Sequence, residues 1–109
     1  MSYDISLKVK VEGIDKYVEV ADGGNITWNV RELIEQASGW EIDNEANNGL
    51  AEHIGVLIAK GIHELETNPE KYKEYEAPNG WGTVDGTLHF FRELLDACQE
   101  HPYAYVFVY

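Results

Sequence analysis

The first residues of the chain alternate between apolar and polar side chains, with a period of two. The odd positions of residues 3–11 are apolar and the even positions of residues 4–12 are polar, which is typical of a half-buried β-strand. A short turn at residues 13–15 and a second alternating stretch at residues 17–20 predict a β-hairpin. We expect the Asp-Gly-Gly-Asn run at residues 22–25 to end its second strand.

A helix is predicted directly after the hairpin, because capping signals and helical spacing coincide there. Asn29 is the expected N-cap, and Glu32, three residues later, completes a capping box. Gly39 supplies the left-handed residue that ends the helix. Trp28 and Trp40 flank the helix, and we expect both to make apolar contacts at its ends.

Two longer helices follow, separated by a short helical turn. Residues 48–66 carry an apolar stripe at helical spacing, and Gly61 within it predicts close packing of another element. Asn and Pro at residues 68 and 69 predict a short turn of helix through residue 75. Thr83 is the expected cap of the last helix, and Pro102 closes it.

The final stretch, residues 103–109, reads as a strand with two apolar faces. The odd positions are Tyr103, Tyr105, Phe107 and Tyr109, and the even positions are Ala104, Val106 and Val108. We expect the aromatic side chains to face the core, because they carry more burial energy. In the opposite orientation they form an interface or a dimer contact.

The order of these elements predicts an α+β fold. It reads β-β-α-α-(α)-α-β, which is satisfied by a three-stranded, mainly antiparallel sheet in the order 2-1-3. Three main helices are expected to pack on one face of that sheet. The 109 residues fit a single domain that spans residues 1–109.

Negative charge changes the range of partners that we expect. Twenty acidic and eight basic side chains give a formal charge of −12, which argues against direct binding of nucleic acid or of anionic membranes. Residues 32–59 hold six acids and no lysine or arginine. This stretch is either a solvated face or a surface for a basic partner, including a groove that normally holds nucleic acid. The candidate surface residues are Glu35, Glu41, Asp43, Glu45 and Glu52.

Sequence features favour a cytoplasmic protein. No apolar run approaches the length of a membrane span, and no basic start followed by an apolar block indicates a secretory signal. The single cysteine, Cys98, cannot form an internal disulfide, which agrees with a reducing compartment.

Catalytic and metal-binding motifs are not found in the sequence, so we expect neither enzymatic activity nor a cofactor. The four histidines do not follow metal-ligand spacing. Asp85, His89 and Glu93 recur every four residues and offer ligands or a base with its orienting group, but their polar neighbours favour a solvated helix face. Cys98 lies on an apolar stripe, which favours a buried, unreactive thiol.

The loop at residues 77–82 is the segment that local rules explain least. Trp81 lies between two glycines, and we expect it to pack in the core between the helix predicted at residues 48–66 and the last helix. The alternative is a ligand or partner loop in which Trp81 is the anchor, with Tyr72, Tyr75 and Asn79 nearby.

Three segments together resemble a known group of sequences. They read Asn-Pro-x-x-Tyr from residue 68, Pro-Asn-Gly-Trp-Gly from residue 78, and Gly-x-Leu-x-Phe-x-x-x-Leu-x-x-Ala-Cys from residue 86. This pattern, with the Asn-Ile-Thr-Trp-Asn run from residue 25, resembles small uncharacterised proteins encoded in phage and prophage genomes. The resemblance implies an accessory protein that acts through contacts, and it brings no catalytic residues.

Two functions therefore compete. The first is a non-catalytic interaction protein that binds a protein partner with a basic patch, with an inhibitor that mimics nucleic acid as a special case. The second is a small-ligand binder that uses the Trp81 loop. A homodimer through the C-terminal strand is a further expectation.

Overall fold

The structure is a computed structural model that describes residues 1–44, 49–78 and 80–109. Its strands are β1 (Ser2–Val11), β2 (Lys16–Thr27) and β3 (Tyr105–Val108). Its helices are α1 (Arg31–Ser38), α2 (Ala51–Thr67), α3 (Pro69–Tyr72) and α4 (Val84–Glu100), with 3-10 turns η1 (Trp28–Val30) and η3 (Lys73–Tyr75). The predicted α+β fold is confirmed, with an antiparallel sheet in the order β2-β1-β3.

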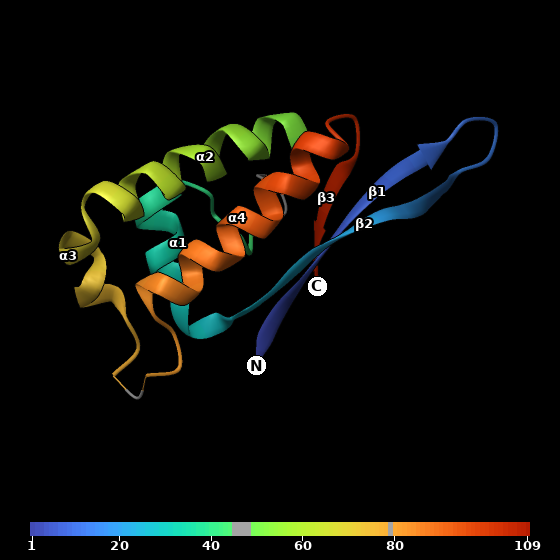
Figure 1. The fold of residues 1–109 in the computed structure, drawn as a ribbon. Coiled ribbons are helices and arrows are strands. Elements are labelled where there is room, and N and C mark those ends of the chain that lie inside the picture. The colour runs from blue at the N-terminus through green and yellow to red at the C-terminus, as the bar shows by residue number, and fades with distance from the viewer. Residues whose placement is uncertain (45–48, 79) are drawn as a thin grey trace.

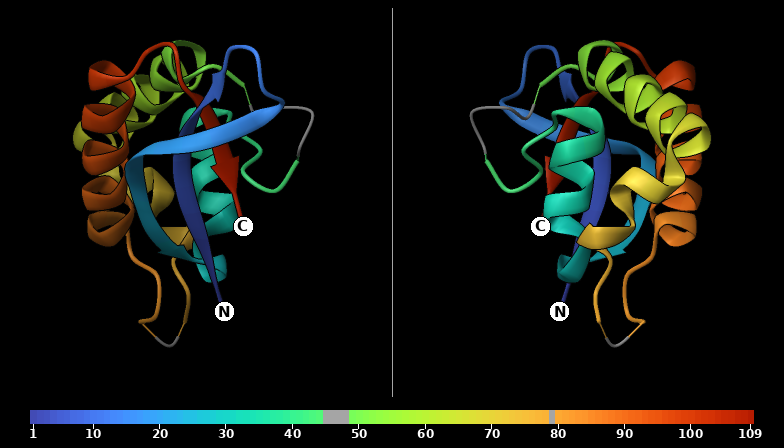
Figure 2. Two further views of the ribbon diagram at one scale, coloured as in Figure 1. Left: turned by 90° about the vertical axis from the view of Figure 1, so that its right-hand side faces the viewer. Right: turned by 90° about the vertical axis from the view of Figure 1, so that its left-hand side faces the viewer.

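The helices lie together on one side of the sheet (Figures 1 and 2). Helices α2 and α4 run antiparallel and pack on each other through Gly61, where an added Cβ would lie 2.6 Å from Phe91 Cε2. The close packing predicted at Gly61 is therefore confirmed. None of the described helices combines the length and the apolar run that crossing a membrane requires.

Strand β1 follows the predicted alternation, but β2 is longer than expected. Tyr3, Ile5 and Leu7 are buried on the helix side of the sheet. The glycines at residues 23 and 24 do not end β2, which continues to Thr27 through two shifts of register. Gly23 allows this path, since an added Cβ would lie 2.7 Å from Ile5 Cγ2.

The start of the first helix differs from the prediction, whereas its end agrees. Asn29 is not the N-cap: Thr27 Oγ1 accepts a hydrogen bond from the Asn29 backbone at 3.3 Å and begins η1. Helix α1 ends at Gly39, which has the left-handed φ of 82° that glycine adopts readily. Trp40 after it is fully buried.

The two long helices, α2 and α4, begin at or near the residues predicted from the sequence. Helix α2 starts at Ala51, three residues after the predicted start. Thr83 caps α4, as predicted, by accepting a hydrogen bond from the Gly86 backbone at 2.9 Å. Helix α4 ends at Glu100, just before Pro102.

The orientation predicted for the final strand is wrong. Ala104 and Val106 are buried, whereas Tyr103, Tyr105 and Tyr109 are exposed and Phe107 is half-buried. Ala104 and Val106 belong to the buried core, so the helix side of the final strand is occupied by its small side chains and the aromatic ones take the other side. The Val106 backbone also donates to Gly49 O at 3.0 Å, which ties the strand to the segment before α2.

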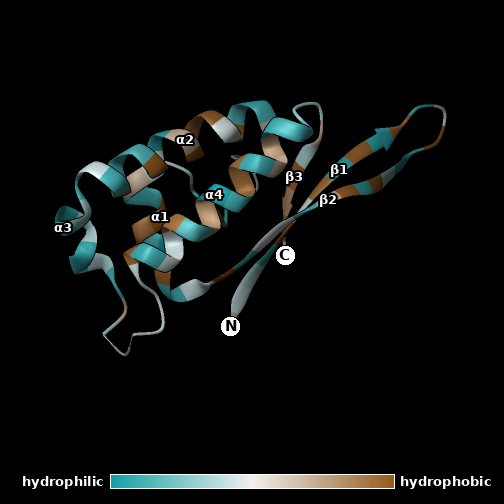
Figure 3. Cartoon of the chain, in the orientation of Figure 1, coloured by the Kyte–Doolittle hydropathy of each residue, from teal (hydrophilic) through white to brown (hydrophobic). Residues whose placement is uncertain are grey.

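The β1–β2 hairpin projects beyond the helices. Strand β3 pairs only with residues 5–8 of β1, so residues 9–20, here called the arm, form a two-stranded ribbon past its end. The arm is the extension at the upper right of Figure 1, and the molecule measures 49 Å along its longest axis. Figure 3 shows that hydrophobic segments continue along both strands of the arm.

Candidate functional site

The Trp81 loop does not have the geometry expected of it. Trp81 is 72% exposed, so the prediction that it packs in the core is wrong. Gly82 beside it, by contrast, lies against the core, where an added Cβ would be 2.5 Å from Val30 Cγ1. The loop is therefore held at Gly82 while its tryptophan points away from the core.

Tyr72 and Tyr75, which were predicted to lie near Trp81, make structural contacts elsewhere. Tyr72 is buried and donates to Glu64 Oε1 at 2.6 Å, and the Tyr75 ring lies 6.5 Å from the Tyr72 ring. Asn79 lies outside the described residues. Tyr72 thus joins α3 to α2, and it does not form an aromatic site with Trp81.

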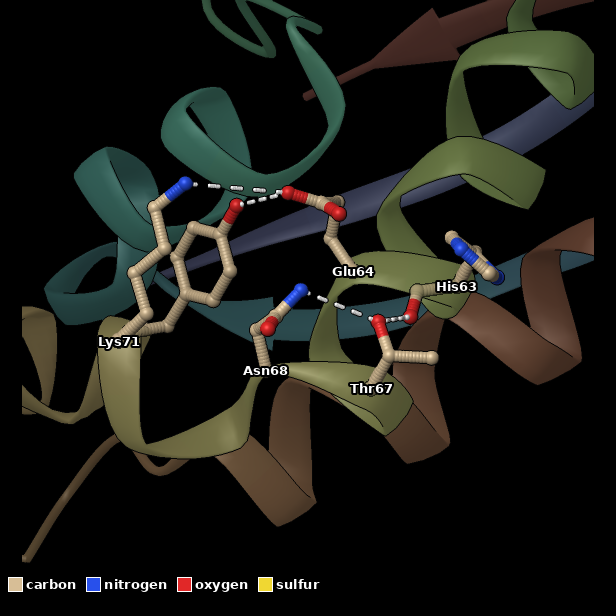
Figure 4. Close-up of polar contacts among 6 residues, drawn as sticks. His63, Glu64, Thr67, Asn68 and Lys71 are labelled. Carbon is tan, nitrogen blue, oxygen red and sulfur yellow. Dashed lines mark hydrogen bonds and ion pairs between the residues drawn. The ribbon is translucent and has the colours of Figure 1, made fainter.

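Polar contacts around Glu64 fix the junction between α2 and α3 (Figure 4). Lys71 Nζ lies 4.0 Å from Glu64 Oε1, and Thr67 Oγ1 donates to the His63 carbonyl at 2.7 Å. The hydrogen bond from Tyr72 lowers the pKa of Glu64, and burial followed by the Glu64 contact raises the pKa of Tyr72 to about 12. Both shifts favour an ionised Glu64 that accepts a hydrogen bond from a neutral Tyr72, which is a structural contact.

The carboxylate and histidine series on α4 lies in solvent. His89 Nε2 is 3.1 Å from Glu93 Oε1, with side chains 75% and 59% exposed, and Asp85 is exposed as well. The described residues contain no group of three or more histidine, cysteine or acidic side chains arranged to hold a metal ion. This geometry agrees with the solvated face that the polar neighbours of these residues favour.

Cys98 is buried, as the sequence predicts, and burial raises its pKa to about 11. It lines a shallow apolar hollow of about 300 Å³ between α2 and α4, beside Gly55 and Leu95. A thiol with this pKa is protonated at neutral pH and is a poor nucleophile.

The predicted acidic surface residues are distributed over several elements. Asp43 Oδ2 lies 3.6 Å from Arg31 Nη1, and Glu41 Oε2 accepts from Asn44 Nδ2 at 2.8 Å. Glu35 lies half-buried on α1, and Glu52 is exposed in the first turn of α2. Glu45 lies outside the described residues.

A small hollow forms where Tyr3 and Trp28 meet the Arg31–Asp43 pair. The two rings are tilted with centroids 5.8 Å apart, and Trp28 is 47% exposed. Burial, followed by the charge of Asp43, raises the pKa of Tyr3. Trp28 therefore packs on Tyr3 at the edge of the sheet, with half of its surface in solvent.

The largest departure from expectation is an aromatic cluster on the open face of the sheet, the face turned away from the helices. It consists of Tyr17, Tyr105, Phe107 and Tyr109. The Tyr17 ring meets Tyr105 and Phe107 edge-on, with centroid distances of 6.0 and 5.2 Å. The signal for this cluster in the sequence is the second apolar face of the final strand, and the direction predicted for that face is wrong.

Lys8 holds this cluster together from the middle strand. Its Nζ lies 5.1 Å from the centre of the Phe107 ring and 4.8 Å from that of Tyr109, and it donates to the Tyr109 hydroxyl. Cation–π contacts of this kind fix aromatic rings in place. The exposed rings are therefore held in place by contacts within the chain itself.

Comparisons with known proteins add no relative. No family model, no curated protein and no solved structure matches the chain.

Proposed function

We propose that this protein is a non-catalytic interaction protein that binds another protein through the aromatic cluster. The observation that carries the proposal is the position of Tyr17, Tyr105 and Tyr109, which are 42%, 41% and 58% exposed although Tyr17 packs on Tyr105 and Lys8 holds Tyr109. Tyrosines are over-represented among the residues that dominate binding energy, and fixed side chains lose little entropy on binding.

The charge of the chain supports a partner with a basic patch. A net charge of −12 attracts such a partner from a distance and accelerates encounter. The open tyrosine rings then offer faces on which arginine or lysine side chains of the partner stack. A partner whose basic patch normally holds nucleic acid is a special case, in which this protein acts as an inhibitor and competes with DNA or RNA. An accessory protein of phage type agrees with that role.

The alternative, a small-ligand binder, depends on Trp81. Because Trp81 is exposed and is not part of the aromatic cluster, changing it tests this alternative separately. Both surfaces present an exposed aromatic side chain, but the cluster joins four rings and Lys8, whereas Tyr72 is buried away from the loop. The geometry therefore favours the aromatic cluster as the binding surface.

The test compares proteins retained from a cell lysate by immobilised wild type, by a Tyr105→Ala/Tyr109→Ala variant and by Trp81→Ala. We expect a retained protein that is lost with the double variant, kept with Trp81→Ala, and released as salt shortens the Debye length from about 10 Å to about 3 Å. Titration of the purified partner should then show at least a tenfold loss of affinity for the double variant. Equal retention by all three forms, or loss with Trp81→Ala alone, contradicts the proposal.

A further inference from the structure

The hollow beside Trp28, here called the Trp28 hollow, brings together side chains from separate parts of the chain. Tyr3 comes from β1, Trp28 and Arg31 come from η1 and the start of α1, and Asp43 follows that helix. The hollow has a volume of about 440 Å³ and is partly open to solvent. Small-molecule sites in proteins have volumes of about 300–1,000 Å³. A small ligand therefore fits in the Trp28 hollow and has a path of entry.

The aromatic wall of the Trp28 hollow is fixed within the fold. Tyr3 is only 7% exposed, and its ring packs on the Trp28 ring at a tilt of 37°. The Trp28 backbone also donates a hydrogen bond to Met1 O at 3.2 Å. Trp28 nevertheless keeps 47% of its surface exposed. Its indole therefore offers a fixed ring surface for an aromatic group of a ligand.

Two opposite charges lie side by side in the same hollow. Arg31 Nη1 is 3.6 Å from Asp43 Oδ2, which is longer than a normal hydrogen bond, and the two side chains are 53% and 45% exposed. An ion pair this exposed adds little stability, so a ligand that engages both groups gives up little. A guanidinium binds a carboxylate through two parallel hydrogen bonds, and a carboxylate accepts hydrogen bonds from an ammonium group.

Charge complementarity identifies the ligand. An α-amino acid carries a carboxylate and an ammonium group on one carbon, so a single small molecule meets both Arg31 and Asp43. Its net charge is zero, so a chain with a charge of −12 does not repel it, whereas that chain repels the phosphates of a nucleotide. We propose that the Trp28 hollow binds a free aromatic α-amino acid, with its carboxylate on Arg31, its ammonium group on Asp43 and its ring against Trp28.

The affinity of the Trp28 hollow is low, because the ligand is small and the hollow is partly open. For about twelve non-hydrogen atoms we expect a dissociation constant of about 0.1–5 mM. None of the residues that line the hollow belongs to the aromatic cluster. The Tyr105→Ala/Tyr109→Ala variant should therefore bind the amino acid like the wild type, and this inference does not depend on the proposed function.

Titration with L-phenylalanine, followed by NMR, tests the proposal. The chain has three tryptophans, and Trp28→Phe identifies the indole N–H signal of Trp28. That signal should shift and saturate, whereas the signal of Trp81, which is 72% exposed, reports non-specific stacking and should stay in place. 3-Phenylpropionate lacks the ammonium group, phenethylamine lacks the carboxylate and L-alanine lacks the ring, so each should bind at least about tenfold more weakly. No shift at Trp28 up to about 10 mM, equal shifts at Trp28 and Trp81, or an analogue that binds as tightly as L-phenylalanine overturns the proposal.

Variants that remove one charge test which side chain binds which end of the ligand. Arg31→Gln should weaken L-phenylalanine at least about tenfold but should not weaken phenethylamine, which has no carboxylate. Asp43→Asn should weaken L-phenylalanine but not 3-phenylpropionate, which has no ammonium group. Arg92→Gln is the matched control, because Arg92 is 55% exposed and forms an ion pair with Glu66 at 3.0 Å. Equal losses of affinity in Arg31→Gln and Arg92→Gln, with unchanged circular dichroism, overturn the proposed contacts.

Discussion

Tyr72 and Glu64 are joined by a 2.6 Å hydrogen bond between the phenol and one carboxylate oxygen, across the junction of α3 and α2. Tyr72 is almost fully buried, while Glu64 remains partly exposed. The short helix α3 has little stability of its own, so this contact holds it against α2.

The first prediction concerns the pH dependence of that contact. Because the folded-state pKa of Glu64 is lowered, first by the Tyr72 hydrogen bond, its contribution is complete above the ordinary pKa of 4.5. The contribution disappears as the pH falls through the lowered value. Glu64→Gln should therefore lower stability at neutral pH and flatten the loss of stability in acid, measured by urea unfolding at a series of pH values. Tyr72→Phe should do the same, at a cost of about 1 kcal/mol at neutral pH. An unchanged acid profile in both variants contradicts the assignment.

The second prediction uses two glycines of α2 as a matched pair. Alanine is favoured over glycine in a helix by about 1 kcal/mol, so the space around each position decides the outcome. At Gly61 a Cβ would lie 2.6 Å from Phe91 and 2.9 Å from Ser38, and Gly61→Ala should destabilise by about 1–3 kcal/mol. At Gly55 the nearest atom is Cys98 Cβ at 3.4 Å, so Gly55→Ala should be neutral or stabilising. Thermal unfolding distinguishes the two, and equal effects would show that helix packing at Gly61 is looser than described.

Sequence patterns predicted the structure correctly where the residues next to a position determine its backbone conformation. The alternation in β1, the left-handed Gly39 and the Thr83 cap each depend on neighbours in sequence, and the structure has all three. The sheet order also follows from the elements and their sequence. These features place the helices and leave one face of the sheet open.

The sequence did not predict which side chains point into the core where a segment has two apolar faces. In β3 the larger side chains lie outside the core, and Ala104 and Val106 are the residues of this segment that are buried within it. Burial energy per side chain cannot predict this, since the volume left by distant segments decides it. The prediction for Trp81 is wrong as well. In this loop it is Gly82 that lies against Val30, and an added Cβ there would already be too close to Val30.

The third prediction contrasts two tryptophans. Trp81 is 72% exposed, so Trp81→Ala should change the free energy of unfolding by no more than about 0.5 kcal/mol. Trp40 is fully buried, and Trp40→Ala should cost about 3–5 kcal/mol. Urea unfolding followed by circular dichroism, rather than by fluorescence, gives both values. A large loss of unfolding free energy for Trp81→Ala would mean that this side chain packs in the core.

The fourth prediction concerns the reactivity of Cys98. Its pKa of about 11 leaves roughly one thiol in a thousand ionised at pH 8, and the side chain is only 2% exposed. Reaction with a disulfide reagent at that pH should therefore be at least about 100-fold slower in the folded protein than in urea, because the thiolate is the reacting form. Cys98→Ser supplies the baseline without a thiol. The hollow between α2 and α4 reaches Cys98 from outside, so rapid labelling of the folded protein would mean that this hollow opens and that burial there is transient.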